Sequence, residues 1–189
     1  MPRSLRNLPP GSVAHCVNRG NDKRFLFERA RDYEDFLQMV VWAKAQCAVR
    51  IVAYCLMANH WHFVFWAERT GDVSQFLHRL TTTHAKSWRR RTDTVGCGHV
   101  YGDRFHASKI FTERYYYNVL RYVEQNPLRA NLVDAARDWR WSSLSERLGN
   151  ERGIIEEGPA GLPMEWPALV DADLPEDDIQ EIRRELQRH

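Results

Sequence analysis

The sequence predicts an α+β fold, in which a ferredoxin-like antiparallel sheet carries helices on one face. Strand and helix patterns follow one another as β-α-β-β-α-β-α, an order typical of helices packed on an antiparallel sheet. The chain has 189 residues, 43% of them hydrophobic, enough for one domain with its own core. We expect a leader over residues 1–10, a domain over residues 11–150 and an acidic tail over residues 151–189.

The first half of the domain is predicted to hold a strand, a helix and a strand hairpin. Residues 31–46 place apolar side chains at helical spacing, and residues 50–57 form the apolar, β-branched run of a buried strand. The turn at Ala58 and Asn59 then leads into a returning strand. In chain order the elements are expected at residues 13–17, 31–46, 50–57 and 62–66.

The second half of the domain is predicted to hold a long helix, a strand and a shorter helix. The long helix follows Gly71-Asp72, with Asp72 or Ser74 as its candidate cap, and ends in the basic run 89–91. A polar loop over residues 92–103 leads to a strand over 104–112 and a helix over 113–126, which Pro127 ends because the residue before proline avoids the helical region. Residues 128–148 are expected to cover this core.

Composition restricts the compartment and the partners. No apolar run approaches the ~20 residues of a membrane span, and no apolar segment follows the basic first six residues. We therefore expect a cytoplasmic protein with no membrane contact. The four cysteines form no C-x-x-C pair, which favours free thiols over disulfides or structural zinc.

Charge is distributed unevenly along the chain. Residues 151–189 contain eleven acidic and four basic side chains, a net charge of −7, which leaves +9 for residues 1–150. A basic body with an acidic tail suggests a polyanionic partner, with the tail competing for the same surface. Two ordinary solvated surfaces would show the same charges.

Two histidines, His60 and His62, lie at i and i+2 beside the predicted hairpin. On a strand this spacing points both imidazoles to one face, where they can share a metal ion, while Trp61 points to the core. Such a short pattern also arises by accident, so it needs a partner elsewhere in the sequence.

The helix over residues 113–126 offers that partner. Its apolar stripe is Tyr116, Val119, Leu120 and Val123. Tyr122 and Asn126 lie at i and i+4 on a separate polar stripe, which puts a phenol and an amide oxygen one turn apart. None of the residues 115–117, also tyrosines, has an amide four residues later. A helical tyrosine is more often only a half-buried core residue.

These groups together suit attack on a phosphodiester. A phenol with a pKa near 10 is a poor nucleophile at neutral pH, so the phosphate must be polarised and the leaving 3′-oxygen stabilised. One divalent ion held by His60, His62 and the Asn126 oxygen can do both, with positions left open for phosphate oxygens. Mixed nitrogen and oxygen ligands suit Mg or Mn, and zinc remains an alternative.

The motifs resemble those of the single-tyrosine HUH transposases, in particular the branch associated with repetitive extragenic palindromes (REP). The matching segments are Met57–His62, Val17–Asn21, Arg121–Ala130 and Trp141–Ser143, within residues 10–148. Ala58 stands where relatives commonly have proline. The resemblance implies the HUH endonuclease fold and a metal-dependent DNA strand cleavage and joining.

Carried onto this chain, the resemblance makes His60 and His62 metal ligands, Asn126 the third ligand and Tyr122 the catalytic nucleophile, linked to a 5′-phosphate. The implied partner is hairpin DNA with a single-stranded guide. The implied assembly is a monomer or a homodimer, since this branch acts as monomers whereas other transposases of the fold share active sites in dimers.

DNA contacts are expected from basic and polar side chains near the predicted turns and helix ends. The candidates are Arg19, Asn21, Lys86, Arg89, Arg90, Arg91, Arg104, Arg121 and Arg129. A basic helix end can equally be a solvated surface that complements the helix dipole.

Three functions stay open from the sequence. The first is a metal-dependent endonuclease and strand transferase acting on single-stranded DNA at palindromic hairpins. The second is a catalytically inactive DNA-hairpin-binding protein, and the third a plain metal-binding or RNA-binding domain. The presence of His60, His62, Tyr122 and Asn126 together favours the first over the second.

Overall fold

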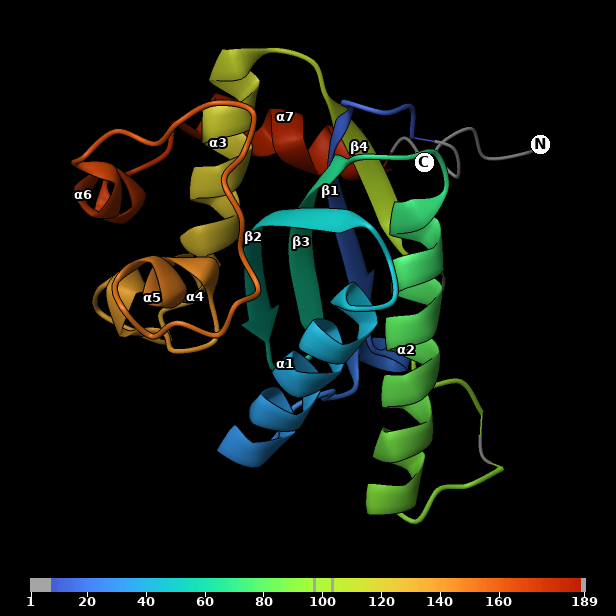
Figure 1. Ribbon diagram of the computed structural model, residues 1–189. Helices are drawn as coiled ribbons and strands as arrows, with labels where there is room; N and C mark the ends of the chain where they lie inside the picture. Colours follow the sequence, from blue (N-terminus) through green and yellow to red (C-terminus); the bar gives the residue numbers. More distant parts are fainter. Residues whose placement is uncertain (1–7, 97, 103, 188–189) are drawn as a thin grey trace.

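The protein is built on a four-stranded antiparallel sheet, seen in a computed structural model that describes residues 8–96, 98–102 and 104–187 (Figure 1). The strands lie in the order β2-β3-β1-β4, the ferredoxin-like arrangement. They span β1 Val13–Arg19, β2 Val49–Met57, β3 His60–Ala67 and β4 His106–Ile110. The predicted α+β class is therefore confirmed.

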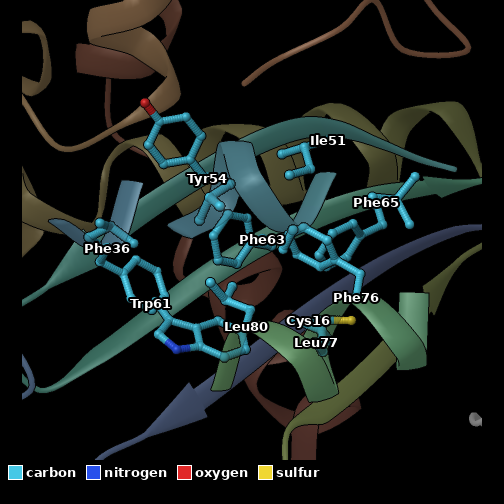
Figure 2. Close-up of a cluster of buried hydrophobic side chains, with 14 of the residues drawn as sticks. Cys16, Phe36, Ile51, Tyr54, Trp61, Phe63, Phe65, Phe76, Leu77 and Leu80 are labelled. Atoms are coloured by element: carbon cyan, nitrogen blue, oxygen red, sulfur yellow. The ribbon is translucent and has the colours of Figure 1, made fainter. Parts of the chain in front are cut away.

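One face of the sheet is covered by α1 (Ala30–Lys44) and α2 (Asp72–Arg91), as predicted (Figure 1). The alternation of side chains along β3 sends Trp61, Phe63 and Phe65 to this face. There they pack with residues of both helices, such as Phe36 and Phe76 (Figure 2). All five of these aromatic side chains are fully buried, so this layer forms the larger part of the core.

The opposite face is covered as well, which the prediction of helices on one face did not include. Here α3 (Glu113–Glu124) packs against β2 and β3, α7 (Glu176–Gln187) packs against β4, and α6 (Trp166–Asp171) packs on α3. Shorter elements complete this layer: α4 Asn126–Arg129, η3 Ala136–Asp138 and α5 Ser143–Arg147, while η2 Asn21–Lys23 lies in the loop between β1 and α1. The site described below lies between this layer and the sheet.

The segment beyond residue 150 is part of this second layer. Trp166, Val170 and Ile182 are buried in the same hydrophobic cluster as Val119 and Leu120 of α3. Most of its acidic residues are exposed, such as Glu176 and Asp177 at the start of α7, while Asp178 pairs with Arg114. The expected acidic tail therefore contributes to the core, where the sequence analysis treated it as an appendage.

A buried carboxylate joins α3 to its cover. Glu124, fully buried, accepts hydrogen bonds from Ser143 Oγ (2.5 Å), Arg147 Nε (3.0 Å) and Trp166 Nε1 (2.7 Å). Since Ser143 and Arg147 belong to α5 and Trp166 begins α6, one side chain ties three helices together. This fixes the carboxyl-terminal end of α3.

Element boundaries differ modestly from the predictions. β4 is shorter than the expected strand over residues 104–112. The expected end at Pro127 also differs, because α3 ends at Glu124 and a further turn, α4, follows with Pro127 as its second residue. Cys16, Cys47 and Cys55 are free thiols, as predicted, while Cys97 lies outside the described residues. Most of the predicted leader over residues 1–10 also lies outside them. Within the described ranges, no helix is long and apolar enough to cross a membrane.

Candidate active site

The two histidines of the H-x-H pair lie at the beginning of β3, on the face toward α3. His60 pairs with Arg19 of β1 across the antiparallel ladder, and His62 pairs with Val17. Trp61 between them is fully buried in the opposite layer. The His60 and His62 rings have centroids 5.0 Å apart, so the expected same-face geometry is observed.

Each of these imidazoles uses its Nδ1 within the protein. His60 Nδ1 lies 2.7 Å from Asn59 Oδ1, and His62 Nδ1 lies 2.9 Å from Nε2 of the fully buried His15. Among the described residues, the buried His62 Nε2 has no hydrogen-bond partner. An unpartnered buried nitrogen is the atom expected of a ligand position, because metal-binding histidines commonly engage their other nitrogen with a protein group.

Tyr122 projects from α3 into the same space. Its side chain is 7% exposed, and its ring stands edge-on to His62, with centroids 5.9 Å apart, and to His15 at 6.1 Å. Asn126, one turn later, donates from Nδ2 to the Tyr122 carbonyl oxygen at 2.8 Å. This bond fixes the amide and leaves its oxygen as the atom that can bind a cation.

The electrostatic surroundings keep both imidazoles neutral. Burial, with a smaller contribution from Arg19, lowers the pKa of His60 to about 4. The pKa of His62 is held well below its usual value by burial, and further by the histidines around it, Arg19 and Arg129. The Arg129 guanidinium also lies over the Tyr122 ring, 5.1 Å from its centroid. At neutral pH the Tyr122 ring therefore lies beside the neutral imidazoles of His62 and His15 and against the Arg129 guanidinium.

We expect the burial of neutral histidines to make the fold acid-sensitive. Burial lowers the pKa values of His15 and His84 to about 3, against 6.5 in an unfolded chain. As the pH falls from 6.5 toward 3, these histidines are protonated in the unfolded state but stay neutral in the folded state. Each of them therefore lowers the free energy of unfolding by about 1.4 kcal/mol per pH unit in that range.

Urea unfolding at pH 7, 5.5 and 4.5 measures this loss. His84 packs against Phe27 and Phe36, away from the candidate site, so His84→Phe removes one titrating group and should flatten the dependence. A free energy of unfolding that does not change between pH 7 and pH 4.5 would contradict the expectation.

The residues present fit a divalent ion. No group of three or more His, Cys, Asp or Glu side chains that could enclose a metal is found in the part of the chain that the structure describes. The donors available are instead two neutral imidazoles and one amide oxygen, a set that leaves coordination positions open. Such an open set suits an ion that also binds a phosphate.

The predicted DNA-contacting residues lie in several parts of the structure. Arg19 pairs with His60 across the β1–β3 ladder, and Arg129 lies over the Tyr122 ring. Lys86, Arg89 and Arg90 lie at the carboxyl-terminal end of α2. This helix ends on the same side of the molecule as the end of the sheet at which β3 begins (Figure 1). The exposed Arg104 precedes β4, and Asn21 lies in the turn after β1.

Three of the predicted contacts, Arg89, Arg91 and Arg121, are engaged with protein groups, and Arg89 donates to the Gly98 carbonyl oxygen. Arg121 donates to the carbonyl oxygens of Leu169, Ala172 and Asp173, so its guanidinium clamps the segment from α6 to α7 against α3. Arg91 lies 3.2 Å from the Asp32 carboxylate at the start of α1. The guanidinium of Arg121 therefore holds the cover over α3, which the sequence analysis did not foresee, and its contact with DNA stays a prediction.

His15 was missed by the sequence analysis. It occupies the middle of β1 on the face shared with His62, and it is the only polar side chain of the apolar run 13–17. That isolation was the available signal, because a buried imidazole within a strand needs a hydrogen-bond partner. The partner, His62, lies 47 residues further along the chain.

Comparison with known proteins agrees with this architecture. A family model described as "Transposase IS200 like" matches residues 11–126, a range that includes His60, His62, Tyr122 and Asn126. A solved REP-associated tyrosine transposase bound to a REP hairpin is similar in fold, with a TM-score of 0.64 and 18% identity over 87% of this chain and 99% of that chain.

A candidate transposase from Deinococcus radiodurans R1 is more distant, with a TM-score of 0.45 and 12% identity over 66% of this chain and 95% of that chain. The curated proteins contain no sequence match.

The ferredoxin-like sheet carries paired histidines on one strand, and they face a helix that bears a tyrosine. The matched model covers more than half of the chain. The protein belongs to the IS200-like transposase family.

Proposed function

We propose that this protein cleaves and rejoins single-stranded DNA beside palindromic hairpins, with Tyr122 as the nucleophile and a divalent ion, Mg or Mn, held by His60, His62 and Asn126. The observation that carries the proposal is the edge-on contact of Tyr122 with His62, whose buried Nε2 has no partner among the described residues. A nucleophile and an open ligand position share one small space.

The chemistry follows from these side chains. Tyr122 Oη forms a bond to phosphorus while the bond from phosphorus to the 3′-oxygen breaks; the phenol proton passes to water, and the departing oxygen takes up a proton as a free 3′-hydroxyl. When bound, the divalent ion polarises the phosphate and stabilises the leaving oxygen. Arg19 and Arg129 neutralise the phosphate, and Asn126 is held in place by its bond to the Tyr122 carbonyl. Attack by a 3′-hydroxyl on the phosphotyrosine reverses the step.

Hairpin DNA is the proposed partner because the protein of similar fold binds a REP hairpin. We assign the chain to the REP-associated branch on that likeness and on its motifs. Tyr122 and the histidines that it meets belong to one chain, so a second copy is not needed to complete the site. We therefore favour a monomer over a homodimer, acting on DNA in the cytoplasm.

A cleavage assay tests the proposal. A hairpin with a labelled single-stranded flank is incubated with the protein and Mg or Mn, and the products are separated under denaturing conditions. We expect a covalent protein–DNA adduct and a DNA fragment with a free 3′-hydroxyl, both lost on addition of EDTA. Hairpin binding without any adduct would instead support a catalytically inactive hairpin-binding protein. Tighter binding to RNA than to hairpin DNA would support an RNA-binding domain.

We expect His15 to orient the metal ligand His62. A bond from His62 Nδ1–H to His15 Nε2 places the proton on Nδ1 and the lone pair on Nε2, where the ion is proposed to bind. His15→Leu removes the acceptor and is expected to weaken Mn²⁺ binding about 10- to 100-fold.

Isothermal titration with Mn²⁺ measures this effect. His15→Gln keeps an oxygen acceptor at similar reach and should bind Mn²⁺ nearly as the wild type does. Circular dichroism checks that each variant is folded. Equal Mn²⁺ affinity in the wild type and the folded leucine variant would show that His15 does not orient the ligand.

A further inference from the structure

An exposed aromatic side chain lies in the loop that is hydrogen-bonded to the turn before His60. Phe25, in the loop between β1 and α1, is 58% exposed, whereas its neighbours Leu26 and Phe27 are buried. A phenylalanine this exposed contributes nothing to the core. Isolated exposed apolar side chains are common, so the case rests on how this one is held and on what surrounds it.

The backbone around Phe25 is fixed on the hairpin that carries His60. Leu26 N and Phe27 N both donate to the Ala58 carbonyl oxygen, at 2.8 and 3.0 Å, and Gly20 N donates to the Asn59 carbonyl oxygen at 2.9 Å. Ala58 and Asn59 form the turn directly before His60. These hydrogen bonds therefore hold the loop against the turn that precedes the proposed metal ligand His60.

The other side of the loop is fixed on α2. Trp88 Nε1 donates to the Phe25 carbonyl oxygen at 3.2 Å, and the Arg24 guanidinium lies 5.2 Å from the centroid of the Trp88 ring. The loop also keeps Asp22 and Lys23 in the left-handed region, at φ of 51° and 59°. Strained backbone of this kind persists where the surroundings impose it and is frequent at ligand-binding segments.

Basic side chains accompany Phe25 along the loop. Arg19, the last residue of β1, and Lys23 are exposed, and Arg19 pairs with His60 across the β1–β3 ladder. Arg24 directly precedes Phe25 and lies over the Trp88 ring. A rigid aromatic side chain next to cationic groups matches the general composition of single-strand binding surfaces, where bases stack and phosphates are neutralised.

We propose that Phe25 is a stacking platform for one unpaired base of the single-stranded DNA flank that leads to the cleaved phosphate. The inference rests on the proposed function, and it assigns to Phe25 the selection of flanked over blunt hairpins. Stacking needs only the face of a base, so Phe25 holds the strand without specifying its sequence. The adjoining cations meet the phosphates on either side of that base.

Binding measurements on Phe25 variants test the platform. In the Tyr122→Phe background, which prevents cleavage, fluorescence anisotropy gives Kd values for a blunt hairpin and for hairpins with a short 5′ or 3′ single-stranded flank. Phe25→Ala should weaken binding of one flanked hairpin about 5- to 100-fold and leave the blunt hairpin unchanged. Phe25→Trp retains an aromatic face and should bind flanked DNA as tightly as the parent.

Fold and function are checked separately. Because the side chain is exposed, Phe25→Ala should melt at the parent temperature. If the parent prefers flanked hairpins and Phe25→Ala keeps that preference, or if both DNAs lose affinity equally, the platform is wrong and the proposed function stands. If the parent binds none of these DNAs, both are wrong.

Discussion

Replacement of Tyr122 by phenylalanine is expected to abolish covalent attachment to DNA, lowering the cleavage rate at least about 1,000-fold. The substitution removes only the hydroxyl. The ring contacts with His62 and His15 and the Arg129 guanidinium above the ring stay in place, so the fold and hairpin binding should be preserved. A labelled flanked hairpin with Mg or Mn, followed by denaturing electrophoresis, measures both adduct and free 3′-hydroxyl product.

Matched controls come from the same helix. Tyr115→Phe and Tyr117→Phe each remove one rival phenol and should leave the adduct at the wild-type level. Tyr117 is engaged elsewhere, since its hydroxyl donates to the Gly161 carbonyl oxygen at 2.9 Å. An adduct that survives Tyr122→Phe and disappears in one of these variants would transfer the nucleophile to that residue.

The second large effect is expected at Glu124. Glu124→Ala should lower the free energy of unfolding by about 3–5 kcal/mol, because it leaves the Arg147 guanidinium uncompensated in a largely buried position. The Ser143 hydroxyl and the Trp166 indole N–H lose their acceptor as well. Urea unfolding followed by circular dichroism gives the change.

An ion pair on the surface of the same layer provides the comparison. Arg114 of α3 lies 3.3 Å from Asp178 of α7, but its side chain is 83% exposed, so Arg114→Ala should change the free energy of unfolding by less than about 1 kcal/mol. A loss at Glu124 as small as the loss at Arg114 would mean that the carboxylate does not hold the helices together.

The centre of the site was predictable from sequence because local periodicity determines it. A spacing of two on a strand fixes which face His60 and His62 share, and a spacing of four fixes Tyr122 beside Asn126 on a helix. The hairpin signal before His60 and the apolar stripe of α3 were enough to orient both toward one core. The ferredoxin-like order followed from the succession of elements.

The surroundings of the site depend on contacts that no local pattern contains. His15 contacts His62 across 47 residues of sequence, and Arg121 donates to the Ala172 carbonyl oxygen across 51. The acidic composition of residues 151–189 suggested a solvated tail, whereas the spacing of Val170, Ile179 and Ile182 buries them under α3 and β4. Deleting residues 151–189 would therefore expose core side chains as well as remove the negative charge of the segment.

The most direct measurement is to locate the DNA on the protein. The wild-type chain is reacted with a flanked hairpin in the presence of Mg or Mn, digested with nuclease and protease, and examined by mass spectrometry. We expect a nucleotide remnant joined through a 5′-phosphate to the oxygen of Tyr122, and none after reaction in EDTA. A remnant on Tyr115, Tyr116 or Tyr117, or its absence from a protein that binds the hairpin, would contradict the assignment of Tyr122 as the nucleophile.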